Sequence, residues 1–258
     1  MAVFGIFGTK TENVASTTYY GLYALQHRGQ ASTGIVVNDD GIFRAYKDSG
    51  IVNEVFTPDV LASLGTGQMA LGNVRYGTSA TKDRVNAEPM LVNHIKGRLA
   101  VAHNGKLVNY AELRRDLELQ GSIFHTSNDV EVISYMITKE RLNAPSIEEA
   151  VNRAMDKLKG AYSMIVMSPQ KLIAARDENG LHPLCYGLRD DGEYVIASES
   201  CALDVVGATF VREVEPGEIV VFTKEGIKSI RDHCGKKPER LCVFEYIYTA
   251  RPDSVIDN

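Results

Sequence analysis

The stretch Val3-Phe4-Gly5-Ile6-Phe7-Gly8 begins the sequence with an apolar run that ends in glycine. A run this short, ended by a glycine, predicts a buried strand rather than a helix. Phe4 is expected at the end of this internal strand, where burial of its ring contributes roughly 1.5–3 kcal/mol relative to exposure. We therefore expect Phe4→Cys to destabilise the protein.

Turn sequences recur along the rest of the chain and predict adjacent antiparallel strands. They are Asn38-Asp39-Asp40-Gly41, Lys96-Gly97, Asp177-Glu178-Asn179-Gly180, Asp190-Asp191-Gly192, Glu215-Pro216-Gly217 and Lys224-Glu225-Gly226. The segment 162–167 is apolar at nearly every position, so both of its faces must be covered. Helical spacing is clearest from Ile147 to Leu158, after a capping box at Ser146 and Glu149. Two packed sheets with helices outside satisfy these requirements, in an α+β fold.

Composition narrows the class of protein. The chain has 258 residues, 44% hydrophobic and 24% charged, with a net charge of -5. The negative charge argues against a nucleic-acid or membrane-surface partner, and no apolar run approaches the roughly 20 residues of a membrane span. We expect no signal peptide and a cytoplasmic protein. Four dispersed cysteines and the spacing of the histidines predict neither a disulfide scaffold nor a metal site, and no cofactor is expected.

Three polar clusters interrupt the apolar pattern. They are Leu25-Gln26-His27-Arg28-Gly29-Gln30, Asn73-Val74-Arg75-Tyr76-Gly77-Thr78 and Ala102-His103-Asn104-Gly105-Lys106-Leu107, with Ser127-Asn128-Asp129 opening a later helix. Each has an ordinary interpretation: Arg75 as a surface strand residue, Asn104-Gly105 as a hairpin turn, and Asp129 as a helix N-cap.

Taken together, these residue types suit an amino-acid ligand. An arginine can bind an α-carboxylate through two hydrogen bonds, and a carboxylate such as Asp129 can pair with an α-ammonium. An asparagine amide and a neighbouring glycine N–H can form an oxyanion hole. Such a site would bind an amino acid and stabilise attack on its side-chain carbonyl.

Short segments spread in order over nearly the whole chain carry a resemblance to a known family. They are Gly5-Ile6-Phe7-Gly8, Leu25-Gln26-His27-Arg28-Gly29-Gln30, Val74-Arg75-Tyr76, Ala102-His103-Asn104-Gly105, Gly160-Ala161-Tyr162-Ser163, Arg176-Asp177, His182-Pro183-Leu184, Ala197-Ser198-Glu199, Pro216-Gly217-Glu218, Phe244-Glu245-Tyr246-Ile247-Tyr248 and Ala250-Arg251-Pro252-Asp253-Ser254. The chain resembles the class II (N-terminal nucleophile) glutamine amidotransferases, and specifically the glutaminase half of amidophosphoribosyltransferase. This resemblance implies the four-layer αββα fold of the N-terminal nucleophile hydrolases.

The resemblance also implies a role for each site residue and glutamine or a related amino acid as the ligand. Arg75 would bind the α-carboxylate of this ligand, and Asp129 would bind its α-amino group. Asn104 and Gly105 would form the oxyanion hole for its side-chain carbonyl. The segment that contains Arg28 and Gly29 would cover the nucleophile and belong to the substrate-binding site.

The departures from the family carry as much information as the matches. We assign the position of the nucleophilic cysteine to Phe4, whose ring cannot attack a carbonyl. Asn73 stands where the family usually has histidine, Ala31-Ser32-Thr33 replaces an acidic-then-small run, and Asn128 replaces a serine. The family enzyme also continues into a phosphoribosyltransferase domain. We expect a glutamine amidotransferase domain at residues 1–235 and an extension at 236–258 that corresponds to the start of that domain.

Three functional hypotheses remain open. The first is a glutaminase-type domain that cannot hydrolyse glutamine but can still bind it. The second is a non-catalytic binding or regulatory pseudoenzyme that acts through a protein partner or a second copy of the chain, with 244–248 as its contact surface. The third is a hydrolase that uses another nucleophile, such as Thr9 or Ser79. Cys242 falls near an iron–sulfur ligand position of some members, but we interpret it as a half-buried thiol.

Overall fold

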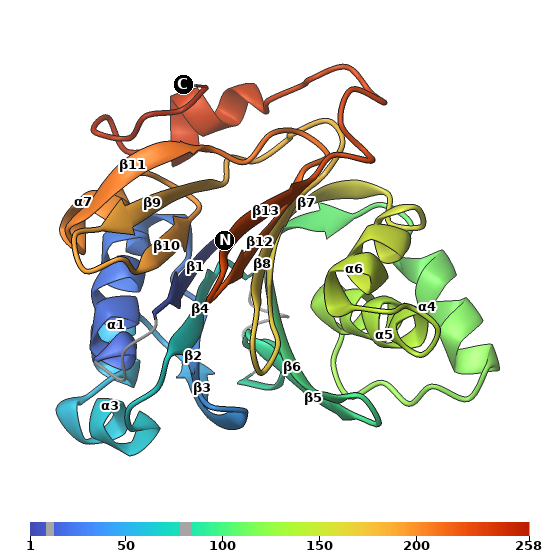
Figure 1. The fold of residues 1–258 in the computed structure, drawn as a ribbon, viewed down its shortest axis with the longest axis horizontal. Helices are drawn as coiled ribbons and strands as arrows, with labels where there is room; N and C mark the ends of the chain where they lie inside the picture. The colour runs from blue at the N-terminus through green and yellow to red at the C-terminus, as the bar shows by residue number, and fades with distance from the viewer. Residues whose placement is uncertain (9–12, 78–83, 258) are drawn as a thin grey trace.

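The protein folds into four layers, with two antiparallel sheets packed face to face and helices on both outer sides (Figure 1). The computed structural model describes residues 1–8, 13–77 and 84–257. Apolar side chains fill the three spaces between the layers, one between the sheets and one beneath each helical layer. The α+β prediction of an αββα sandwich is confirmed.

The first sheet has seven strands and places the N-terminal strand at its centre. Its order is β11 (Ala208–Glu213), β9 (Cys185–Arg189), β10 (Tyr194–Ala197), β1 (Ala2–Phe7), β4 (Met69–Arg75), β2 (Ser32–Asp39) and β3 (Ile42–Ser49). The outer side of this sheet is covered by α1 (Val14–Ala24), α2 (Val52–Val55), α3 (Pro58–Leu64) and α7 (Cys201–Val205). A 3-10 turn, η1 (Gln26–Arg28), follows α1.

The second sheet has six strands, in the order β13 (Gly226–Ile230), β12 (Ile219–Thr223), β8 (Leu172–Arg176), β7 (Gly160–Met167), β6 (Gly97–Leu107) and β5 (Met90–His94). Its outer side carries α4 (Tyr110–Leu119), α5 (Asp129–Arg141) and α6 (Ile147–Met155). The strand β7 is buried on both faces because one face meets the other sheet and the other face meets these helices. The apolar run at 162–167 is explained by this position.

Local signals in the sequence correspond to local structure at several places. The turn Asp40-Gly41 joins β2 to β3, and both residues have positive φ, as the turns that connect tight hairpins require. Ser146 caps α6 by accepting a hydrogen bond from the Glu149 N–H at 3.2 Å.

None of the helices in the described part of the chain combines the length and the apolar character needed to cross a membrane.

The C-terminal segment lies across one end of the first sheet (Figure 1) and includes a short π-helical turn, η4 (Glu245–Thr249). Backbone hydrogen bonds connect Arg240 to Asn179 at 2.7 Å and Cys242 to Leu181 at 3.1 Å. The Asp257 N–H donates to a carboxylate oxygen of Glu213 at 2.8 Å. The predicted extension at 236–258 therefore packs onto the preceding residues, and its correspondence to a transferase domain stays a prediction.

Phe4 lies in the middle of β1, not at its end, and its side chain belongs to the outer core beneath α1. Its ring is fully buried and passes directly beneath Gly21, where an added Cβ would lie 2.2 Å from a ring carbon. Successive side chains of a strand point to opposite faces, so Val3 and Phe7 face the other sheet while Phe4 faces the helices. Phe4 is therefore a packing residue of the outer layer.

We expect Phe4→Ala to lower the free energy of unfolding by about 3–5 kcal/mol, since it leaves a cavity between β1 and α1. Urea denaturation measures this loss, with the exposed Tyr23→Ala as the control. The destabilisation by Phe4→Cys that we expect from the sequence stays a prediction, and packing beneath α1 is its physical reason. A stability equal to that of the parent chain would show that the ring does not support this layer.

Candidate functional site

The first residue of the chain lies between the sheets at one end of the first sheet. In β1, Ala2 pairs with Val74, so Met1 is placed beside Arg75 at the end of β4. The Met1 α-amine donates to the Arg28 carbonyl at 2.7 Å, and the Arg28 Nε donates to the Met1 carbonyl at 3.3 Å. Burial, followed by the nearby Arg28 charge, lowers the pKa of this amine to about 5. The amine is therefore mainly unprotonated at neutral pH.

The segment after η1 is fixed against the end of β4. The Ala31 N–H donates to the Arg75 carbonyl at 2.9 Å. Gly29 lies so close to Arg75 that an added Cβ would be 2.6 Å from the Arg75 carbonyl carbon. Only glycine allows this approach of the two backbones. The structure thus brings Met1, Arg28, Gly29 and Arg75 together.

Asn104 and Gly105 lie within β6, which faces the first sheet. They pair with Ser163 and Tyr162 of β7, so the alternative interpretation of this dipeptide as a hairpin turn is wrong. Asn104 is 3% exposed, and its Nδ2 has no hydrogen-bond partner. Gly105 has φ +152 and an added Cβ would lie 2.1 Å from the Ala161 carbonyl oxygen, so a side chain is excluded here. A buried amide donor without a partner is costly and marks a candidate ligand contact.

Asp129 is the first residue of α5 and is 3% exposed. Its Oδ2 accepts from the Leu107 N–H at 2.8 Å, and its Oδ1 lies 3.3 Å from the Nε2 of His103. Burial alone would raise the pKa of Asp129, but His103 and the Leu107 N–H outweigh burial and hold that pKa well below its usual value. Asn128, not Asp129, caps the helix, since its Oδ1 accepts from the Val130 N–H at 3.2 Å.

Glu88 is a buried acid of this region that sequence reasoning missed. It is fully buried beside His103, and it also contacts Asn73 and Asn128, the two positions already noted as departures from the family. A single glutamate before Pro89 carries no sequence signal of burial. Only its partners, which lie 15 to 40 residues away, reveal its place.

Arg28, a residue predicted for the substrate-binding site, uses its guanidinium to bind two carboxylates of the chain itself. It pairs with Glu199 and, through two hydrogen bonds of 2.8 and 2.7 Å, with both oxygens of Glu245. His27 and His182 contact the same two carboxylates at 2.8 and 2.7 Å. The backbone of Arg28 covers Met1, while its charge attaches the C-terminal segment to the domain.

The side chain of Phe4, the residue predicted at the position of the lost nucleophile, does not point toward these residues either. Its side chain is on the opposite face of the first sheet from Arg75 and Asn104, as the alternation of β1 requires. Thr9, Thr78 and Ser79 lie outside the described residues. At the strand end next to Arg75, the residue found is Met1.

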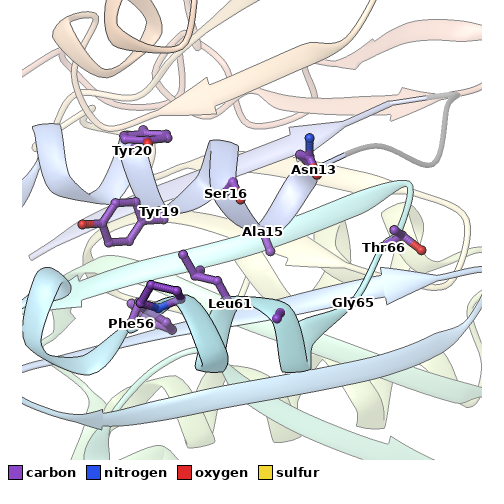
Figure 2. A pocket seen from close by; sticks show the side chains of 11 residues that line it. Asn13, Ala15, Ser16, Tyr19, Tyr20, Phe56, Leu61, Gly65 and Thr66 are labelled. Carbon is purple, nitrogen blue, oxygen red and sulfur yellow. The ribbon is translucent and has the colours of Figure 1, made fainter.

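A cleft of about 600 Å³ lies elsewhere, on the outer side of the first sheet. Figure 2 shows Tyr19 and Tyr20 of α1 on one side of it and Leu61 of α3 with Phe56 on the other. Its lining includes none of Arg75, Asn104 and Asp129. The cleft is therefore separate from these three residues.

Comparisons with known proteins agree with this geometry. Residues 78–205 match the family described as glutamine amidotransferase domain. The amidophosphoribosyltransferase of Bacillus subtilis is 45% identical over 256 residues, covering 99% of this chain and 52% of that protein. The amidophosphoribosyltransferase of Methanocaldococcus jannaschii is 42% identical over 269 residues, covering 99% of this chain and 57% of that protein. A solved structure titled as the allosteric regulatory enzyme of purine biosynthesis has a TM-score of 0.93 and 45% identity, over 100% of this chain and 54% of that one.

The fold and these matches define a glutamine amidotransferase domain with the N-terminal nucleophile fold. Within that class the chain is similar, over nearly all of its own length, to the amidophosphoribosyltransferases. It spans about half the length of the curated relatives it matches.

We expect Arg28→Met to lower the free energy of unfolding by about 3–5 kcal/mol at neutral pH, because it leaves buried carboxylates without their cation. Burial would raise the pKa of Glu199, but His27 and Arg28 hold it at about 2, so this carboxylate stabilises the fold above its unfolded pKa and stops doing so as the pH falls through about 2.

Without Arg28 the pKa of Glu199 rises, so the variant's deficit should shrink as the pH approaches about 4. Urea denaturation at two pH values tests this, with Arg153→Met, which removes an exposed pair with Glu149, as the control. A deficit below about 1 kcal/mol, in the range of surface pairs, would contradict the assignment.

Proposed function

We propose that this domain binds glutamine or a closely related amino acid between the two sheets and that, with methionine at the start of β1, it does not hydrolyse it. The observation that carries the proposal is the buried Asn104 amide without a partner, aimed into the space between the sheets. A ligand carbonyl would supply the missing acceptor.

Two charged residues supply the other contacts of a free amino acid. Arg75 ends β4 on the face that meets the second sheet, and its guanidinium can bind an α-carboxylate through two hydrogen bonds. Asp129 opens α5 as a carboxylate with a strongly lowered pKa, which suits an α-ammonium. Asn104 and the Gly105 N–H then take the side-chain carbonyl. These residues together match the α-carboxylate, the α-ammonium and the side-chain carbonyl of glutamine.

The missing step is nucleophilic attack. In this class, a cysteine at the start of the first strand gives its thiol proton to its own α-amine, and its sulfur attacks the amide carbon. Ammonia leaves, and water hydrolyses the thioester to glutamate. Here the Met1 α-amine has the lowered pKa that such a base requires. The side chain of Met1, however, is a thioether, which has no proton to give. We therefore assign the nucleophile's position to Met1 in place of Phe4.

The names of the relatives support a proposal about the pathway in which the domain acts. Those matched over nearly all of this chain are named amidophosphoribosyltransferases. We propose that the domain descends from, or belongs to, a cytoplasmic protein that uses the amide nitrogen of glutamine in purine synthesis.

A non-catalytic role through a protein partner is the second candidate, and a surface observation favours it. The C-terminal segment exposes a set of apolar side chains: Val243, Phe244, Tyr246, Ile247 and Tyr248, of which Tyr248 is 88% exposed. Exposed apolar groups gathered on one segment mark a contact surface. A chain that acts only in this way would bind no glutamine.

We expect isothermal titration calorimetry to detect binding of L-glutamine to the unchanged chain. Arg75→Gln and Asp129→Asn should each weaken this binding by about 10- to 100-fold, since each removes one charged hydrogen-bonding partner.

Matched controls are Arg98→Gln on the same strand as Asn104 and Asp116→Asn on α4, both at exposed positions. Their affinity should equal that of the parent. Equal weakening by the controls, or no binding by the folded parent chain, would refute the ligand site and leave the partner-binding role.

A further inference from the structure

Glu88 is the central acid of a buried polar network behind the ligand site. It follows the 3-10 turn η3 (Arg84–Asn86) and precedes β5, and its side chain is fully buried. The loop is fixed on either side of it, because the Lys47 Nζ donates to the Ala87 carbonyl at 2.7 Å and to the Pro89 carbonyl at 3.3 Å. A carboxylate buried to this degree needs several donors.

Donors from three different elements supply that need. The backbone N–H of His103 donates to the Glu88 Oε2 at 2.8 Å, and the His103 Nδ1 lies 3.2 Å from the Oε1. The Asn128 Nδ2 donates to the Oε1 at 2.9 Å and the Asn73 Nδ2 to the Oε2 at 3.4 Å. The two asparagines that depart from the family pattern therefore both serve this one carboxylate.

His103 connects Glu88 to the ligand site. Its imidazole is fully buried, with the Nδ1 facing Glu88 and the Nε2 lying 3.3 Å from the Asp129 Oδ1. Burial alone would lower the pKa of His103, but the two carboxylates raise it to about 10. The imidazole is therefore a cation with a carboxylate oxygen 3.2 Å from its Nδ1 and another 3.3 Å from its Nε2.

Glu88, His103 and Asp129 form a line of three charged groups, and other charges near this line come from several elements. Lys47 of β3 and the α-amine of Met1, which precedes β1, interact electrostatically with Glu88, and Lys106 of β6 does so with Asp129. Two carboxylates and one imidazolium leave one negative charge within the line itself. The proposed function assigns Asp129 to the ligand ammonium, so a ligand cation is the group that would complete the line at that end.

We propose that Glu88 is a positioning residue of the ligand site, which holds His103 as an imidazolium and through it keeps Asp129 ionised and aimed at the ammonium group of an amino-acid ligand. The inference rests on the proposed function for its ligand. It adds that the ligand must carry a free, protonated α-amine, because an acylated amine would leave the Asp129 charge without a partner.

The direct test is a titration of the His103 imidazole by ¹⁵N-resolved nuclear magnetic resonance, from about pH 6 to about pH 9. In the unchanged chain His103 should stay protonated throughout. In Glu88→Gln its pKa should fall by more than about one unit, since one of its two carboxylates is removed. The control is Glu131→Gln, another buried acid on α5, whose oxygens accept from the His125 and Thr126 N–H groups instead.

A second measurement connects this charge to the ligand. Calorimetry at neutral pH should show that Glu88→Gln weakens L-glutamine binding by about tenfold or more, and that the loss grows with pH as His103 deprotonates. N-acetyl-L-glutamine should not bind the parent. If Glu88→Gln does not fold, Glu88→Asp keeps a carboxylate but draws it away from the imidazole, and should lower the His103 pKa by less.

Each outcome decides a separate part of the account. A His103 that titrates near 6.5 in the parent, or a pKa unchanged in Glu88→Gln, would overturn the inference. A lowered pKa with unchanged glutamine affinity would overturn the positioning role. A His103 pKa that falls in Glu88→Gln, together with a parent chain that binds no glutamine, would refute the proposed function and would leave Glu88 as a structural partner of His103 only.

Discussion

The imidazole of His103, enclosed between two carboxylates, is the constraint on which this end of the molecule depends. A buried cation without paired anions is strongly unfavourable, so Glu88 and Asp129 must both be held in place. Glu88 comes from the loop before β5, His103 from β6 and Asp129 from the start of α5. The Asn73 amide reaches the His103 carbonyl at 3.3 Å from β4 of the other sheet. A polar contact thus joins the two sheets at the site, in addition to the apolar packing between them.

A second constraint is the alternation of side chains along β1. Val3 and Phe7 face the second sheet, whereas Phe4 faces α1, so one strand serves both the inner and the outer core. The outer face needs bulk, and Phe4 beneath Gly21 supplies it. The inner face leads to Met1, whose α-amine lies beside Arg28. Packing and site chemistry are therefore divided between the two faces of one strand, and a change at Phe4 acts on the first of these.

Much of the fold was predictable from the sequence because its signals are local. Turn residues such as Asp40-Gly41 and the cap at Ser146 act within a few residues, and the apolar run of β7 reports burial on both faces. The site was less predictable because its contacts join distant residues. Nothing near Arg28 in the sequence indicates that Glu199 and Glu245, 171 and 217 residues away, bind its guanidinium. An all-apolar strand likewise does not reveal which face meets which layer, so the direction of the Phe4 side chain could not be predicted.

The central claim is that the site between the sheets is complete except for the nucleophile, at the position of Met1. The most direct measurement is ammonia release from L-glutamine by Met1→Cys, produced behind a removable leader so that the cysteine carries the free α-amine. The account predicts ammonia from this variant and none from the parent or from Met1→Ala. Silence from a folded Met1→Cys chain that binds glutamine as tightly as the parent would contradict it.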